Sequence, residues 1–196
     1  MNRELETFYF ERVNMVPYDL SHNPFGFKHN NGSDISAHMP LLSFIAKDLK
    51  HITEFGTREC YSTSAFLLTC PGKVVSYDIN VYPDILKLQQ IIPQDKWQFI
   101  QRSTIDPALE IENTDFLFID TLHTYEQVKL ELLQAKFVNK YIGFHDTFSH
   151  GLESLDISGA KGIIYAINEF LEDNREWSIV YEVYFNHGLV IIERQL

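Results

Sequence analysis

The feature that most constrains the fold is a continuous apolar run, residues 116–119 (Phe-Leu-Phe-Ile), that ends abruptly at Asp120. Parallel strands covered by helices on both faces have unbroken hydrophobic sequences, so this run predicts a buried strand. His123 follows three residues later, just before a predicted helix. In open α/β sheets ligands bind at this edge, so Asp120 and His123 are candidate site residues.

The helix after this strand has a recognisable start. Thr124 and Gln127 form a T-x-x-Q capping box. Apolar residues then recur at helical spacing and are expected to line one face of a helix that continues through residue 138: Tyr125, Val128, Leu132 and Ala135.

The chain after residue 49 repeats this alternation of strand and helix with short connections. Strands are expected at 51–55, 73–77, 97–102, 116–119 and 141–144, and helices at 62–68, 84–92, 108–111 and 125–138. A helical stripe at 163–171 precedes strands at 177–185 and 189–193, which a short turn joins into a hairpin. This order predicts a Rossmann-like, doubly wound α/β fold, with a mostly parallel seven-stranded sheet and a C-terminal antiparallel hairpin.

The length of 196 residues suits one domain spanning 1–196. Residues 51–196 form its expected Rossmann-like core, and residues 1–50 an N-terminal helical or lid segment. Ser33 and Asp34 are expected to cap a helix that reaches Leu49, and the loop-like stretch 21–32 can form the lid.

Composition limits the partners. The formal charge of −11 argues against a nucleic-acid partner, because such binding needs clustered Lys and Arg. No segment has the pattern of a signal peptide or a membrane span, so a cytoplasmic protein without a membrane partner is expected. Cys60 and Cys70 flank a predicted helix and would lie roughly 15 Å apart, too far for a disulfide, so two reduced thiols are expected. A homo-oligomer is compatible with the sequence.

The turns after the first three predicted strands hold candidate cofactor residues. Glu54 and Gly56 lie where a nucleotide-like ligand would approach the backbone, although a plain tight turn explains them equally well. The turn lacks the later glycines of a G-x-G-x-x-G fingerprint, which counts against a pyrophosphate cofactor. Asp78 has the spacing of an acid that binds ribose hydroxyls, and a cap for the next helix is the alternative. Ser103 and Thr104 would lie near an adenine edge, but they are also ordinary turn residues.

Four polar residues follow the fourth and fifth predicted strands: Asp120, His123, His145 and Asp146. Because these strands are neighbours in such a sheet, their tips can converge. Asp120, His145 and Asp146 would suit a divalent cation, with oxygen ligands favouring Mg²⁺. His123, at a helix N-terminus, is expected to be neutral and to act as a general base. The alternative is that each residue only caps a turn or bonds to the backbone.

These motifs resemble the class I S-adenosylmethionine-dependent methyltransferases, in particular the small-molecule O-methyltransferases that include macrolide-sugar methyltransferases and a cephalosporin-hydroxylase-like branch. The similarity covers residues 33–194. It consists of Glu54-Phe55-Gly56, the acid Asp78, the I-D-x-x-H-x-Y-E signature at 119–126, the F-H-D-T at 144–147 and the closing hairpin.

The resemblance implies an enzyme that transfers a methyl group from S-adenosylmethionine to a hydroxyl of a small polar acceptor, such as a sugar. It implies that His123 is the base, that Asp120 with Asp146 ligates Mg²⁺, and that Glu54, Gly56 and Asp78 hold the cofactor. Together with the positions in the predicted turns, the expected metal site is Asp120, His145 and Asp146, and the expected cofactor site is Glu54, Gly56, Thr57, Asp78, Ser103, Thr104 and Asp120. The alternatives are a differently active enzyme on this fold, metal-assisted and hydroxylase-like or nicotinamide-dependent, and a non-catalytic binding module.

Overall fold

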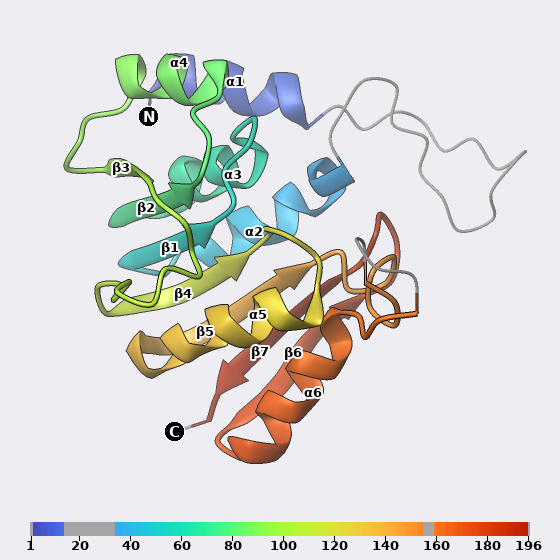
Figure 1. The fold of residues 1–196 in the computed structure, drawn as a ribbon. Coiled ribbons are helices and arrows are strands. Elements are labelled where there is room, and N and C mark those ends of the chain that lie inside the picture. Colours follow the sequence, from blue (N-terminus) through green and yellow to red (C-terminus); the bar gives the residue numbers. More distant parts are fainter. Residues whose placement is uncertain (1, 14–33, 155–158, 196) are drawn as a thin grey trace, which may run out of the picture.

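A seven-stranded sheet forms the centre of the protein (Figure 1). The computed structural model describes residues 2–13, 34–154 and 159–195. The strands are β1 (His51–Phe55), β2 (Lys73–Asp78), β3 (Trp97–Gln101), β4 (Thr114–Ile119), β5 (Val138–His145), β6 (Trp177–Val183) and β7 (Leu189–Arg194). They lie in the order β3-β2-β1-β4-β5-β7-β6, with β1 to β5 paired in parallel and β7 antiparallel to both of its neighbours. The predicted fold class is confirmed.

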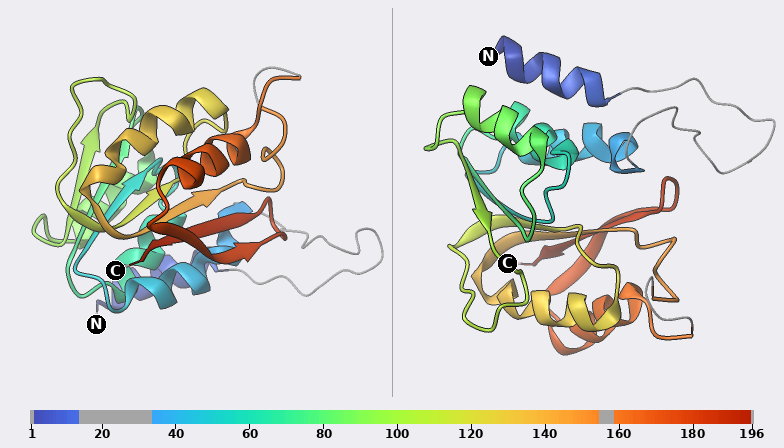
Figure 2. Two further views of the ribbon diagram at one scale, coloured as in Figure 1. Left: turned by 90° about the horizontal axis from the view of Figure 1, so that it is seen from below. Right: turned by 45° about the horizontal axis from the view of Figure 1, so that its top comes forward.

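Helices cover both faces of the sheet (Figures 1 and 2). The α-helices are α1 (Arg3–Arg12), α2 (Met39–Ala46), α3 (Tyr61–Thr69), α4 (Pro83–Ile91), α5 (Tyr125–Glu131) and α6 (Ile163–Asp173), and two 3₁₀ helices are η1 (Asp34–His38) and η2 (Leu132–Phe137). Alternate side chains of β4 enter opposite cores: Phe116 and Phe118 pack with α1 to α4, and Leu117 and Ile119 pack with α5 and α6. Both faces of β4 are therefore buried, as its sequence predicted.

The register of the sheet brings its strand ends to one edge. Phe55 of β1 pairs with Tyr77 of β2 and with Ile119 of β4, and Ile119 pairs with Phe144 of β5. The next residue on β1 is Gly56, whose φ is +87° and whose added Cβ would lie 1.9 Å from the backbone oxygen of Asp120. Only glycine fits this close approach of two strand ends.

Three helical segments differ from their predictions. The helix expected at 125–138 is α5, which ends at Glu131, followed by the 3₁₀ helix η2. No helix forms at 108–111, because the Asp106 carboxylate accepts the N–H of Ala108, and the Gln134 side chain bonds the backbone of Leu109 and Ile111 in a non-helical path. The helix expected up to Leu49 is η1 followed by α2, which ends at Ala46. Ser33 and the expected lid at 21–32 lie outside the described residues.

The N-terminal helix α1 was not singled out in the sequence, and its last turn is fixed by Arg12. This guanidinium lies 3.4 Å from the centroid of the Phe8 ring and pairs with Asp84 of α4 at 2.7 Å. Cys60 and Cys70 are both free thiols. None of the helices in the described ranges has the length and apolar character of a membrane span.

Glu54, in the middle of the sheet, is fully buried and faces α3. Its carboxylate accepts hydrogen bonds from the hydroxyls of Ser62, Thr63 and Ser76 at 2.6–2.7 Å. Burial raises the pKa of Glu54 to about 7, although the three hydroxyls act in the opposite direction. These contacts join β1, β2 and α3 beneath the turn at Gly56.

The raised pKa predicts a pH-dependent effect of Glu54→Gln on stability. The folded protein keeps this proton to higher pH than the unfolded chain, so the contribution of Glu54 to stability falls between pH about 4.5 and about 7. The free energy of unfolding of the variant should therefore increase relative to that of the wild type as pH rises, by roughly 3 kcal/mol at most. Melting temperatures at pH 5 and pH 8 measure this, with Glu172→Gln, an exposed glutamate of α6, as the control. A difference that does not change with pH would contradict it.

Candidate active site

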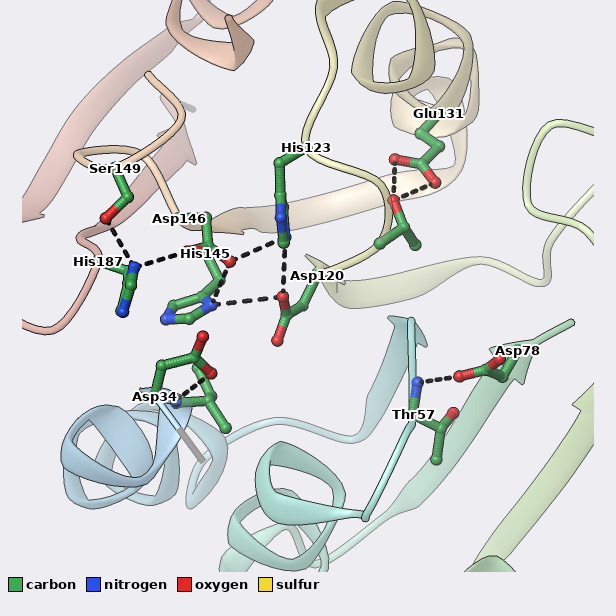
Figure 3. A network of polar contacts seen from close by, with 12 residues as sticks. Asp34, Thr57, Asp78, Asp120, His123, Glu131, His145, Asp146, Ser149 and His187 are labelled. Carbon is green, nitrogen blue, oxygen red and sulfur yellow. Dashed lines mark hydrogen bonds and ion pairs between the residues drawn. The ribbon is translucent and has the colours of Figure 1, made fainter. Parts of the chain in front are cut away.

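The four polar residues predicted at the tips of β4 and β5 converge into one cluster (Figure 3). Nε2 of His123 lies 3.3 Å from Asp120 Oδ1 and 2.9 Å from Asp146 Oδ2. Nδ1 of His145 lies 3.3 Å and 3.1 Å from the same two oxygens. We call Asp120, His123, His145 and Asp146 the histidine–aspartate cluster. Its nitrogens and oxygens alternate around a closed ring of contacts.

Local structure explains the position of each member of the cluster. Asp120 follows β4, and its N–H bonds to the oxygen of Phe55, which fixes the strand end. Thr124 caps α5 by accepting the N–H of Gln127 at 3.2 Å, so His123 is held in the turn just before the helix. His145 is the last residue of β5, and Asp146 adopts a left-handed conformation with φ of +60°. Such strain in a non-glycine residue is frequent at functional sites.

Residues from other loops surround the cluster, and the sequence analysis missed them. His187, in the β6–β7 turn, lies with Nδ1 3.5 Å from Asp146 Oδ1 and 2.7 Å from Ser149 Oγ. The ring of His150 stacks on that of His123, with the centroids 5.4 Å apart. The sequence did contain a signal, since His150 and Ser149 follow the F-H-D-T segment and His187 stands in the predicted hairpin turn.

The electrostatics of the cluster correct one expectation. Burial alone would lower the pKa of His123, but its hydrogen bonds to Asp120 and Asp146 raise the pKa to about 9. The expectation of a neutral His123 is therefore wrong for the metal-free protein, because two carboxylates outweigh a helix dipole. The same contacts raise the pKa of His145 and hold the pKa values of both aspartates well below their ordinary range, although burial of the four groups acts against these shifts.

A cavity of about 380 Å³ lies beside this cluster, along the ends of β1 to β4. A volume of this size is typical of small-molecule sites. It is lined by Gly56, Arg58, Tyr77, Asp78, Ile79, Asn80, Tyr82, Arg102, Ser103, Thr104, Ile105, Asp120, Thr121, Leu122 and Gln127. Five of the seven predicted cofactor residues are among them: Gly56, Asp78, Ser103, Thr104 and Asp120.

The other two predicted cofactor residues, Glu54 and Thr57, do not line this cavity. The Glu54 carboxylate is occupied by the three hydroxyls beneath the Gly56 turn. Thr57 is buried, with its N–H bonded to Asp78 Oδ2 at 2.9 Å. A cofactor contact of either residue stays a prediction.

Asp78 organises the turn that follows β1. It accepts the N–H groups of Thr57 and Arg58 at Oδ2 and that of Asn80 at Oδ1, at 2.9–3.0 Å. A carboxylate has about four acceptor positions, so at least one remains for a ligand hydroxyl. Arg58 and Cys60 have φ values of +40° and +60°, the left-handed conformation that glycine adopts most easily.

A second buried acid, Glu131 of α5, supports the cavity wall. Its carboxylate is fully buried and accepts hydrogen bonds from Thr104 at 2.5 Å, Thr121 at 2.8 Å and Gln127 at 2.8 Å, all of which line the cavity. Burial raises the pKa of Glu131 to about 7, against the effect of these bonds. Gln127 therefore completes only half of the predicted capping box, because its side chain turns to Glu131 and Thr104.

The site fits both an adenosine-type cofactor and a cation. Three large apolar side chains at the cavity, Ile79, Ile105 and Leu122, are 39–63% exposed, which provides apolar surface for a flat base. Asp120, His145 and Asp146 offer ligand atoms that lie within 4.8 Å of one another. Carboxylate and imidazole ligands suit several divalent metals.

Solved methyltransferases share this fold at low sequence identity. TomG, an O-methyltransferase from Streptomyces achromogenes involved in tomaymycin synthesis and solved with S-adenosylmethionine, has a TM-score of 0.61 at 14% identity, over 100% of this chain and 91% of its own. An O-methyltransferase from Bacillus cereus, solved with S-adenosylhomocysteine, has a TM-score of 0.59 at 15% identity, over 100% and 92%. The N-methyltransferase NodS from Bradyrhizobium japonicum WM9, also solved with S-adenosylhomocysteine, has a TM-score of 0.58 at 14% identity, over 98% and 97%.

No family model and no curated protein matches the sequence. The structural likeness shows the fold, and it confirms the resemblance at that level: the chain has the fold of the class I S-adenosylmethionine-dependent methyltransferases.

The contacts of His123 predict an unusually basic histidine in the metal-free protein. Its ring should titrate near pH 9, and Asp146→Asn should move the transition toward the ordinary value of 6.5. The ion pair stabilises the fold below pH about 6.5, and this contribution is lost as pH rises through about 9. NMR titration of the histidine ring protons after chelation of metals measures the shift, and melting temperatures over the same range measure the stability. A wild-type His123 that titrates near 6.5 would contradict the ion pair.

Proposed function

We propose that this protein is a methyltransferase that transfers a methyl group from S-adenosylmethionine to a hydroxyl of a small polar acceptor, such as a sugar. The observation that carries the proposal is the position of Asp120, which both lines the cavity and belongs to the histidine–aspartate cluster. A donor held in the cavity would thus adjoin the groups that can remove a proton. The O-methyltransferase fold neighbours support this class of reaction.

Different residues of the cavity would contact different parts of the cofactor. Asp78 would accept a ribose hydroxyl, and Ile79, Ile105 and Leu122 would cover the adenine, with Ser103 and Thr104 near its edge. Gly56 keeps the ends of β1 and β4 in close contact beneath the cofactor. The bound cofactor supplies the electrophilic methyl group.

His123 is the base in this proposal. The ring would accept the proton of the acceptor hydroxyl at Nδ1, while its Nε2–H stays hydrogen-bonded to Asp120 and Asp146, which would stabilise the positive charge that the ring gains. A divalent cation held by Asp120, His145 and Asp146, for which Mg²⁺ is the expectation, would offset the carboxylate charge and lower the pKa of a bound hydroxyl. The protein's part is to align hydroxyl and methyl group, which contributes several kcal/mol to lowering the barrier.

One observation favours a second candidate function, a metal-assisted, hydroxylase-like enzyme on the same fold. His123, His150 and Asp146 offer ligand atoms that lie within 4.8 Å of one another, and two histidines with one carboxylate form the ligand set of many non-haem iron oxygenases. Such an enzyme would need dioxygen and would transfer no methyl group. Incubation with labelled S-adenosylmethionine and acceptor candidates therefore separates the two functions.

The cofactor site can be tested by titration calorimetry with S-adenosylhomocysteine. Asp78→Asn should raise Kd by about 10- to 100-fold, because hydrogen bonds to a charged group are worth about 1.5–3 kcal/mol. Asp95→Asn, an exposed aspartate after α4, should leave Kd unchanged. Asp78 also holds Thr57 and Arg58, so the melting temperature is measured on the same samples. An unchanged Kd in a folded Asp78→Asn protein would refute the ribose contact.

The base can be tested with His123→Ala. Removal of a positioned base should lower kcat by roughly 10²–10⁴-fold while the Kd for S-adenosylhomocysteine hardly changes, because His123 does not line the cavity. The wild-type kcat should rise with pH as His123 loses its proton, and the variant should lack this dependence. A destabilised variant with full turnover per folded molecule would show that His123 is structural.

A further inference from the structure

Asp146 faces two groups of potential ligands with its two carboxylate oxygens. Oδ2 contacts His123 and His145 within the histidine–aspartate cluster, at 2.9 Å and 3.1 Å. Oδ1 lies 3.5 Å from Nδ1 of His187 on the other side. The left-handed backbone at Asp146 places this buried side chain between the two groups.

The group on the second side consists of Asp34, Asp146 and His187, whose ligand atoms lie within 4.8 Å of one another. Asp34 opens η1, where its Oδ1 also accepts the N–H of Ile35 at 2.9 Å. His187 comes from the β6–β7 turn, which is fixed on the loop after β5 because Phe148 and Ser149 donate their N–H groups to its backbone oxygen at 2.8 Å and 3.1 Å. Three segments far apart in the sequence therefore meet at one carboxylate.

A buried nitrogen provides an independent observation. Nε2 of His145 is buried and has no hydrogen-bond partner among the described residues. In Figure 3 this edge of the ring lies on the side of Asp34 and His187, away from Asp120. A buried imidazole nitrogen normally bonds to something, and the oxygen of a water bound to a cation would serve.

We infer that Asp34, Asp146 and His187 form a second cation position, next to the one at Asp120, His145 and Asp146, with Asp146 as the bridging ligand. The inference rests on the proposed function only in assuming a cation at the first position. Bridged cations in two-metal sites lie about 3.5–4 Å apart, a distance that one carboxylate spans. Each position would combine an imidazole with carboxylates, a ligand set that also suits manganese, iron, cobalt or zinc.

Charge and accessibility agree with this assignment. Asp34, Asp120 and Asp146 carry three negative charges, so the four positive charges of two divalent cations would be offset to a net charge of +1. The His187 side chain is 46% exposed, while that of His145 is fully buried, so the second position is the more open one. The Ser149 hydroxyl shares Nδ1 of His187 and would give way to the cation.

The test is a titration of metal-free protein with Mn²⁺ at fixed pH. Calorimetry measures the number of equivalents bound, and electron paramagnetic resonance shows whether the bound ions are spin-coupled. The wild type should bind two equivalents and show the spectrum of a spin-coupled pair. His187→Ala should bind one equivalent with an uncoupled spectrum, and Asp146→Ala should lose the coupled pair altogether. Ser149→Ala, which removes only the competing hydroxyl, should still bind two. His51→Ala, a histidine at the start of β1 on the opposite edge, is the matched control.

Each result decides the question. One equivalent in the wild type, or a coupled pair that survives in His187→Ala, would overturn the second position. A melting temperature for each variant identifies any that fail to fold, and Asp34→Asn then provides a second variant of the same position. Binding of S-adenosylhomocysteine is measured on the same samples, so failure of the metal pair remains distinct from failure of the cofactor site.

Discussion

Two carboxylates held close together in a nearly closed space are the constraint on which the rest of the site depends. Asp120 and Asp146 have ligand atoms within 4.8 Å of each other, and their side chains are only 13% and 4% exposed. At an effective dielectric constant of about 20, two such charges repel by roughly 3–4 kcal/mol. Positive charge must lie between them. The fold supplies it with the imidazoles of His123 and His145, or with a cation that both kinds of side chain would share.

The sheet makes this arrangement possible because parallel strands in register end together. The contact of Gly56 with the backbone of Asp120 fixes β1 against β4, and the pairing of Ile119 with Phe144 fixes β4 against β5. Beneath this edge, Glu54 binds hydroxyl groups of α3 and β2, and Glu131 binds the hydroxyls of Thr104 and Thr121 in the turns above it. Two buried acids thus hold the elements and turns under the cavity in place without lining it. Glu54 and Glu131 thus have a structural role, whereas Asp120 and Asp146 belong to the candidate active site.

The sequence predicted what local patterns determine. Buried parallel strands have continuous apolar sequences, so the seven-stranded sheet and the convergence of Asp120 with Asp146 could be predicted from the sequence, whereas the full strand order comes from the structure. His187 could not be placed beside them, because its position depends on how a distant turn docks on the loop after β5. The helix expected at 108–111 was wrong because side chains took over its backbone hydrogen bonds. The charge of His123 was also missed, since it depends on distances to two carboxylates that no spacing reveals.

The non-glycine residues with positive φ in the described ranges all belong to loops at the carboxyl edge of the sheet: Arg58, Cys60, Asp146, Asn186 and His187. Each costs on the order of 1–3 kcal/mol. Among the described residues, this kind of backbone strain is therefore concentrated at the carboxyl edge of the sheet. Hydrogen exchange in the ligand-free protein would begin at this edge, and bound ligands would suppress it there first.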